Sequence, residues 1–408
     1  MKNNKISLFQ AIRILTVSPF GGGMLFLPHV FSSLGYVTAS VVVLVIFILA
    51  SLSLYLLNIS STNYQKIEVN LTKSPNKYDN IKVSYPKLSK KISFKFKYFT
   101  RLALIASNTG SLIIFLNSAS NILSFLIINK LGIQIIKFNY LKKFTLVFIS
   151  IICFKINKIS TVSTNITLSI ISLSIGIYYV ILMIFLGVLS KNSFSNLIPL
   201  RNKNVSKLLI LLVYATHCQS GYLDITNSLS NSNLRRKNIV ISGLLFTMLI
   251  YLSAGFGGYK FLNNVDINII DYILKNDLFD LYRNSFITTV SEKTFKILLI
   301  ILCMAFLFNF LINIINRINI IKPYLLNIGS SNQIITIHYC LCTLIILFEL
   351  PTITIINIIS TLFTNSICFG LPGLFGFYYS KRNLHKLLSL FLIVIYLINI
   401  SLGIINFI

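Results

Sequence analysis

Two titratable side chains, His217 and Asp224, lie close together in a segment that is otherwise largely apolar. Histidine has the side-chain pKa nearest to neutral pH, so His217 could bind and release a proton during function. A carboxylate inside a membrane-spanning segment is costly, and Asp224 is therefore a candidate functional group. Either residue could carry a coupling proton or pair with a charged substrate. The alternatives are a helix-packing hydrogen bond for His217 and an ion pair at the cytosolic rim for Asp224.

A run of three glycines, Gly21, Gly22 and Gly23, interrupts the first apolar segment between Ser18 and Pro28. Glycine and proline are poor helix formers, and a membrane tolerates unpaired backbone groups only where they face protein or a water-filled cavity. In transporters such breaks hold substrates, because the freed backbone groups become ligands. We expect the glycine N–H groups to bind a substrate carboxylate, with Ser18 adding a hydroxyl contact. The alternative is a kinked helix that packs closely on a neighbour.

The composition is that of a polytopic membrane protein. The 408 residues are 55% hydrophobic and 11% charged, whereas a soluble domain has roughly 25% charged residues. The net charge of +27 does not indicate nucleic-acid binding, because the basic residues flank apolar segments and so reflect membrane topology. The six cysteines lie in or at the edges of apolar segments, so we expect no disulfide framework, no metal site and no cofactor.

Eleven apolar segments are long enough to cross a membrane, for which about 20 residues are needed. They are 8–30, 36–58, 99–128, 141–157, 162–189, 207–229, 238–262, 294–316, 333–350, 353–379 and 384–407. Lysine and arginine predominate in the connections on the side of the N-terminus, so we expect the N-terminus in the cytosol and the C-terminus on the opposite side. The polar stretch 60–97 then forms a cytosolic loop, and 263–293, with most of the acidic residues, an extracytosolic loop.

The sixth apolar segment is interrupted in the same way as the first. After an apolar start it carries the polar sequence His217-Cys218-Gln219-Ser220-Gly221 near its middle. Paired interruptions in corresponding halves of a chain indicate an inverted repeat with a binding site near the membrane midplane. We therefore add His217 and Gly221 to the candidate substrate-binding residues.

Three segments together resemble the amino acid/auxin permease family. The glycine run with Met24-Leu25-Phe26-Leu27-Pro28, followed by Gly35, is similar to that family's first-helix signature. His217, Tyr251 and the sequence Gly257-Gly258-Tyr259-Lys260-Phe261 resemble its sixth and seventh helices. Leu350-Pro351 and the later Leu371-Pro372-Gly373 resemble the passage from its ninth to its tenth helix.

The resemblance implies an all-α, LeuT-like fold with a five-plus-five inverted repeat and an eleventh helix. On this reading residues 1–7 form a cytosolic N-terminus and 8–189 the first five-helix repeat. Residues 190–206 form an extracytosolic loop, 207–379 the second repeat, and 380–408 the eleventh transmembrane helix.

The eighth apolar segment departs from the family's pattern. It has no proline before Arg317, and residues 295–316 contain neither serine nor threonine. In sodium-coupled relatives, hydroxyl groups of this helix help to hold the ion, and a hard cation such as sodium prefers oxygen ligands. Asn309 and Asn313 still offer amide oxygens, so sodium stays an alternative. We expect proton coupling through the two titratable groups, or transport without coupling.

We predict a secondary transporter that moves amino acids across a membrane by alternating access, and not an enzyme, because no metallohydrolase or serine hydrolase motif is present. Its partners would be an amino acid, a proton and the lipid bilayer, with no nucleic acid. The alternatives are a sodium-coupled amino acid transporter and an amino-acid sensor that signals through a partner docked on residues 60–97. We expect the protein in the plasma membrane or in a vacuolar or lysosome-like membrane.

Overall fold

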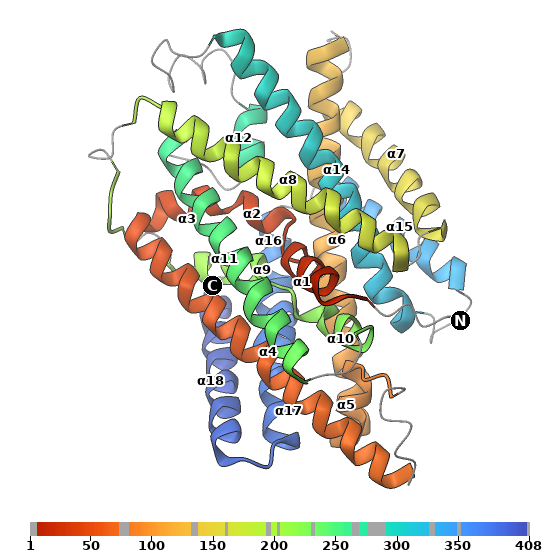
Figure 1. Cartoon of the computed structure of the whole chain (residues 1–408). Coiled ribbons are helices and arrows are strands. Elements are labelled where there is room, and N and C mark those ends of the chain that lie inside the picture. The colour runs from red at the N-terminus through yellow and green to blue at the C-terminus, as the bar shows by residue number, and fades with distance from the viewer. Residues whose placement is uncertain are drawn as a thin grey trace.

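A computed structural model describes the fold. It covers residues 6–72, 81–131, 138–159, 162–192, 197–201, 205–229, 233–262, 269–275, 291–325, 331–348 and 352–405. Within these ranges the regular structure is helical, apart from an isolated bridge between Ile6 and Leu229. The helices gather into a bundle in which consecutive segments run up and down (Figure 1).

The helices of the N-terminal half are α1 (Leu8–Val17), α2 (Gly22–Leu25), α3 (Leu27–Leu34), α4 (Tyr36–Thr72), α5 (Tyr85–Ile92), α6 (Phe94–Leu131), α7 (Phe138–Ile159) and α8 (Val162–Leu189). Those of the C-terminal half are α9 (Val205–Ala215), α10 (Gln219–Asn227), α11 (Asn233–Leu262), α12 (Ile269–Lys275), α14 (Glu292–Leu325), α15 (Ser331–Leu347), α16 (Thr352–Ile359), α17 (Leu371–Tyr379) and α18 (Asn383–Ile405). Two π-helical turns, η3 (Ser360–Thr364) and η4 (Ser366–Gly370), join α16 to α17.

Apart from α5 and α12, these helices correspond to the eleven predicted spans. The first span is made of α1, α2 and α3, the sixth of α9 and α10, and the tenth of the run from α16 to α17. Among the described residues, eight segments are long and apolar enough to cross a membrane. Of the others, α7 has sufficient length but carries lysines near both ends, and α15 is shorter. The predicted all-α, polytopic membrane fold is confirmed.

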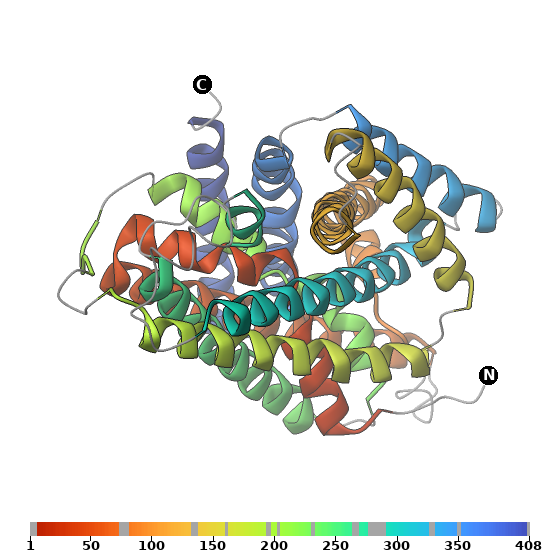
Figure 2. The ribbon, with the colours of Figure 1, turned by 90° about the horizontal axis from the view of Figure 1, so that it is seen from above.

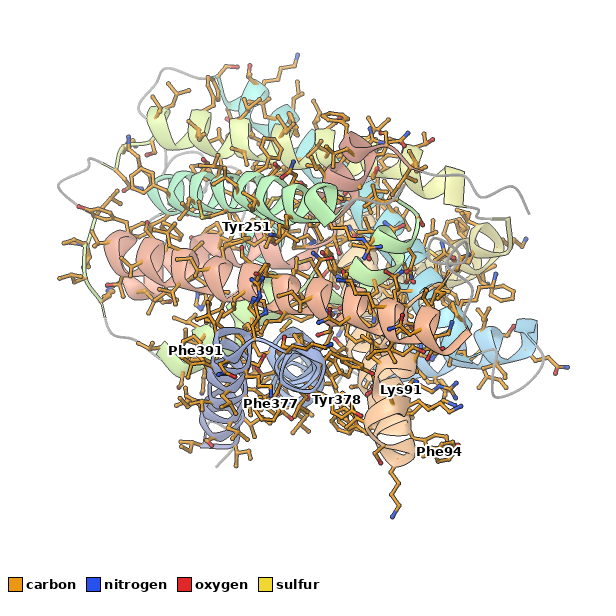
Figure 3. The ribbon with its side chains drawn as sticks, turned by 60° about the horizontal axis from the view of Figure 1, so that its bottom comes forward. Lys91, Phe94, Tyr251, Phe377, Tyr378 and Phe391 are labelled. Atoms are coloured by element: carbon orange, nitrogen blue, oxygen red, sulfur yellow. The ribbon has the colours of Figure 1, made fainter. Side chains whose placement is uncertain are left out.

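The spans differ in how much of their surface is buried inside the protein. The most apolar window of α18 is only 17% buried inside the protein, whereas that of the α9–α10 span is 83% buried. Large apolar side chains project from α17 and α18, among them Phe377 and Phe391 (Figure 3). Such a surface suits contact with lipid, whose tails are as apolar as these side chains. The sixth span, with its break, therefore lies at the centre of the bundle.

The predicted cytosolic loop 60–97 is largely helical. Helix α4 continues through 37 residues to Thr72, a length of about 55 Å, which exceeds the ~30 Å hydrocarbon core of a bilayer. Its polar part bonds to its own backbone, because the Ser60 hydroxyl donates to the Leu56 carbonyl at 2.7 Å. After α5, helix α6 begins at Phe94, earlier than the apolar pattern predicts.

Helix α5 lies against the end of α17. The Tyr379 hydroxyl donates to the Leu88 carbonyl at 2.8 Å, and the Tyr378 hydroxyl donates to the Lys91 carbonyl at 3.2 Å (Figure 3). The Lys91 ammonium also pairs with Glu68 of α4 at 3.1 Å. These contacts place α5 on the side of the bundle where α1 begins.

The backbones of α8 and α11 touch at two glycines. A Cβ at Gly187 would lie 2.8 Å from the carbonyl oxygen of Gly257, and a Cβ at Gly257 would lie 2.9 Å from the backbone nitrogen of Ile184. Small residues allow helices in membranes to approach this closely. Any larger side chain at either glycine would push the two helices apart.

Helix α14 crosses the centre of the bundle between α6 and α8 (Figure 2). It has no capping Pro or Gly within the predicted span and runs on past Arg317 to Leu325, with Pro323 in its last turn. Because the helix continues, Arg317 lies inside it rather than at its end.

Candidate substrate and coupling site

Two broken helices face each other at the centre of the protein. Helix α1 ends at Val17 and the chain becomes helical again at Gly22, while α9 ends at Ala215 and α10 begins at Gln219. Pro19 lacks a backbone N–H, and Gly21 has non-helical backbone angles (φ −145°, ψ −131°), which explains the first interruption. Both breaks occur where the sequence predicts them.

Tyr251 of α11 joins the two breaks. Its hydroxyl lies 2.9 Å from the carbonyl oxygen of Pro19 and 2.7 Å from that of Ala215, and it can donate to either. Tyr251 is fully buried in the middle of α11 (Figure 3). The Pro19 carbonyl also accepts from the Gly21 N–H, whereas for the Ala215 carbonyl this hydroxyl supplies a donor in an apolar interior.

The described glycines of the first break pack against neighbouring helices. A Cβ at Gly23 would lie 2.6 Å from the Cα of Ala215, and a Cβ at Gly21 would lie 2.5 Å from the ring of Phe115. The Gly21 N–H donates to the Pro19 carbonyl at 2.9 Å. Close helix packing therefore requires these glycines, and their predicted role in carboxylate binding stays a prediction.

A row of polar side chains on α14 points at the first break. Asn309, Asn313 and Arg317 recur every four residues, a spacing that puts them on one helix face. The Asn313 amide donates to the Phe20 carbonyl at 2.7 Å, and the Asn309 amide reaches the same oxygen at 3.4 Å. The side-chain oxygen of Asn309, Oδ1, accepts from the Ser172 hydroxyl of α8 at 2.6 Å.

Arg317 connects both breaks and α6. Its Nη1 donates to the Asn108 side-chain oxygen at 3.2 Å and to the Ser220 hydroxyl at 3.4 Å, and its Nη2 donates to the Ser18 carbonyl at 3.2 Å. The side chain is only 6% exposed. All three acceptors are neutral, and neither of the ion pairs found among the described residues includes Arg317.

A cavity of about 410 Å³ leads from Arg317 to the ends of α1, α10 and α14. Its polar wall includes Ser18, Ser169, Gly221, Asp224, Asn313 and Arg317. Its apolar wall includes Ile14, Val17, Ile166, Ile225 and Ile320. The cavity therefore brings together three of the residues predicted from the sequence, Ser18, Gly221 and Asp224.

Asp224 projects from the α10 wall of this cavity and is exposed. Gly221, Asp224, Ile225 and Ser228 line the cavity at the spacing of one helix face. The ion pairs found among the described residues do not include Asp224. Lys82 does act electrostatically on this carboxylate, so pairing with a basic residue at the rim stays an alternative role for Asp224.

His217 lies in the second break but not in the cavity wall. It is 1% exposed, and neither ring nitrogen has a hydrogen-bond partner within the described structure. The backbone N–H of His217 donates to the Tyr214 carbonyl at 3.2 Å. A buried polar group without a partner is costly and is a feature of sites that bind a ligand or rearrange.

Aromatic rings close the protein on the other side of the breaks. Phe115 stacks on Phe310 with 5.7 Å between ring centroids, and Tyr179 packs edge-on against Phe306 at 5.1 Å. Phe306 and Phe310 precede Asn313 along α14, and all four rings are buried. We call these four residues the distal aromatic cluster.

The first residue of α5 and the segment just before it are bonded to the two ends of α10. The Tyr85 hydroxyl donates to the Gln219 carbonyl at 2.8 Å, while Val83 exchanges two backbone hydrogen bonds with the Asn227 side chain, at 3.1 and 2.7 Å. Burial raises the pKa of Tyr85 well above its usual value, so the hydroxyl keeps its proton. The predicted loop is thus attached to the helix that carries Asp224.

Two facing broken helices around a buried polar centre define a transporter of the LeuT-like fold. The chain is similar to a solved structure titled "Structure of Mhp1, a nucleobase-cation-symport-1 family transporter, in a closed conformation with bromovinylhydantoin bound". The TM-score is 0.61 at 11% identity, covering 98% of this chain and 90% of that chain, a likeness that concerns the fold alone. The chain belongs to the family of transmembrane amino acid transporter proteins, whose family model matches residues 4–408. No curated protein matches the chain.

The sequence does not single out Arg317, and the signal for it lies in spacing. The apolar segment predicted at 294–316 ends just before it, so the arginine reads as a boundary residue. The repeat of Asn309, Asn313 and Arg317 at i, i+4 and i+8 marks one polar face on an apolar helix, and such a face inside a membrane indicates a functional group.

Proposed function

We propose that the protein is a secondary transporter that moves amino acids by alternating access, coupled to protons or uncoupled, and not to sodium. The observation that supports this most strongly is one-sided access. The cavity reaches the two breaks from the ends of α1, α10 and α14, while the distal aromatic cluster packs on the opposite side. A site that is open to one side and closed to the other is what alternating access requires.

The proposal of coupling to protons rests on the carbonyl oxygens of the first break. Sodium would need such oxygens as ligands, but the Phe20 carbonyl accepts from Asn313 and the Ser18 carbonyl accepts from Arg317. An amide and a guanidinium thus occupy the positions that a bound cation would need. Asp224 in the cavity wall and His217 in the second break are the proposed proton carriers.

The charged groups named around Asp224 in the described structure are cations. Arg317 and Lys322 line the same cavity, and Lys82 also acts on this carboxylate electrostatically. When the cavity closes, loss of water favours the neutral form of the carboxyl group, and when it opens the charged form is favoured. Such a change in proton affinity between two conformations is sufficient to couple a proton to transport.

The proposed orientation places the N-terminus and the cavity mouth in the cytosol. The lysine and arginine bias of the connections supports it. The membrane would be the plasma membrane or a vacuolar or lysosome-like membrane. The division into two five-helix repeats, 8–189 and 207–379, remains part of this proposal.

Reconstitution in liposomes tests the function. We expect saturable uptake of at least one radiolabelled amino acid, undiminished when choline replaces sodium and increased by a proton gradient directed with the flux. Binding without uptake would favour the sensor instead. Uptake that stops without sodium would refute the coupling part alone.

A further inference from the structure

Arg317 is a buried cation without a buried anion. Its three hydrogen-bond acceptors are an amide, a hydroxyl and a backbone carbonyl, and no ion pair among the described residues includes it. Burying an unpaired charge is expensive. An arginine has five N–H donors, and within the described structure the Nε–H and one Nη2–H are not used in these three bonds. These remaining donors can bind a carboxylate, which a guanidinium prefers.

Asp224 supplies the opposite charge on the same cavity. Ser220, which contacts Arg317, and Asp224 stand four residues apart on α10, and this spacing puts them about one helical turn apart on neighbouring positions of the helix surface. An α-amino acid carries its carboxylate and its ammonium on one carbon, so its head group offers a partner of opposite charge to each of these two residues on the cavity wall. A single charged group could not satisfy both residues.

Apolar side chains form part of the wall beside these two charges, and the polar residues of the wall include Asn316 and Asn319. Val17 comes from α1, Ile225 from α10 and Ile320 from α14. A charged substrate side chain placed against these three residues would lose its hydration, and the other cation of the wall, Lys322, lies in the last turn of α14. An aliphatic side chain would instead be stabilised by burial, at about 25 cal/mol per Å².

We propose that the cavity binds zwitterionic amino acids with aliphatic side chains, with the substrate carboxylate on Arg317 and its ammonium on Asp224. This rests on the proposed function, since it names the substrate class of the same site. In this binding mode the substrate carboxylate contacts Arg317 of α14 and not the backbone of the glycine run. The glycines then serve the close packing of α2 on α9, where Gly23 meets Ala215.

Ligand analogues test the two contacts separately by equilibrium binding to the purified protein. The probes are isoleucine, its methyl ester, which lacks the carboxylate, and 3-methylpentanoic acid, which lacks the ammonium. We expect the intact protein to bind isoleucine at least about 10-fold more tightly than either analogue, the effect of a charge-assisted hydrogen bond. Isoleucine should also bind more tightly than glutamate or lysine.

Two variants then assign the groups. Arg317→Gln should abolish the preference for isoleucine over its methyl ester. Asp224→Asn should abolish the preference for isoleucine over 3-methylpentanoic acid. Lys296→Gln on the exposed start of α14 is the matched control and should keep both preferences. A general loss of structure would weaken all probes together and would not remove one preference selectively.

Some results would overturn the proposal. They are an unchanged preference for isoleucine over the ester in Arg317→Gln, equal binding of isoleucine and its analogues by the intact protein, or a preference for glutamate or lysine. If Arg317→Gln does not fold, the analogue series on the intact protein and on Asp224→Asn still decides. Uptake of another class of amino acid would refute this inference and leave the proposed function standing, whereas failure of uptake for every amino acid would refute the proposed function.

Discussion

The side-chain amide of Asn313 donates to the backbone carbonyl of Phe20 at 2.7 Å. This contact gives a direct test of sodium independence. Asn313→Asp removes the donor and places a carboxylate beside the carbonyl, which creates two oxygen ligands. We expect the variant to lose thermal stability in choline chloride and to recover part of it in sodium chloride, while the parent protein melts at one temperature in both salts.

The exposed residue Asn383 at the start of α18 offers a control for that substitution. Asn383→Asp should melt like the parent in either salt. Asn313→Asp with parental stability in choline would contradict the role given to this hydrogen bond.

Tyr251 should contribute measurably to stability through its hydroxyl. Tyr251→Phe removes the hydroxyl donor of the Ala215 carbonyl, while the Pro19 carbonyl keeps the Gly21 N–H, and an unsatisfied buried polar group costs about 1–3 kcal/mol. Tyr222 is equally buried, and its hydroxyl has no partner in the described structure, so Tyr222→Phe should be neutral. Thermal unfolding of the two variants in detergent compares them, and equal losses would show that the hydroxyl bonds of Tyr251 are not what matters.

The two breaks should tolerate alanine differently. At Gly23 a Cβ would lie 2.6 Å from the Cα of Ala215, but at Gly221 the nearest atom would be the tip of Ile320 at 3.7 Å. We expect Gly23→Ala to reduce the yield of monodisperse protein severalfold and Gly221→Ala to fold normally, since alanine is the better helix former. The measurement is size-exclusion chromatography of the solubilised protein, and a normal profile for Gly23→Ala would refute the close packing.

Transport should depend on pH through the groups at the second break. With a proton as co-substrate, uptake increases as the pH on the donor side falls, and Asp224→Asn or His217→Ala should flatten this profile. Glu68→Gln is the control, because Glu68 pairs with Lys91 at the end of α4, away from the cavity. Parental pH profiles in both Asp224→Asn and His217→Ala would exclude them as proton carriers.

Glycosylation reports the orientation. Asn204-Val205-Ser206 is an acceptor sequence on the side proposed to be extracytosolic, and Asn204 lies outside the described residues. Asn70-Leu71-Thr72 is one at the end of α4, on the proposed cytosolic side. Of these two sites, only Asn204 should be modified in a glycosylating host, and a mobility shift that Asn70→Gln removes would reverse the orientation.

The breaks are predictable from the sequence, but what surrounds them is not. Glycine, proline and polar residues inside apolar runs mark the interruptions at Gly21 and His217 wherever the helices pack. Which neighbour meets a glycine depends on tertiary structure, so the contacts of Gly23 with Ala215 and of Gly21 with Phe115 have no local signal. The carboxylate-binding role expected for the glycines stays a prediction, and it competes with the binding mode proposed for Arg317.

The ends of two helices also differ from those that the apolar pattern predicts. The apolar pattern ends before Arg317 and before Ser60, although both helices continue in polar sequence. Hydropathy measures where the lipid ends, whereas a helix ends where its backbone hydrogen bonding stops. Arg317 became visible as a site residue only once α14 was seen to extend past it.

The contact between Gly187 and Gly257 constrains the transport cycle. Packed helices usually slide on one another through their side chains, which rearrange as they move. Where two backbones touch directly, no side chains lie between them that could rearrange. A small shift would then drive the Gly257 carbonyl into α8. Helices α8 and α11 must therefore travel as one rigid body, and a pair of spin labels placed on them would report the same distance in every state of the transporter.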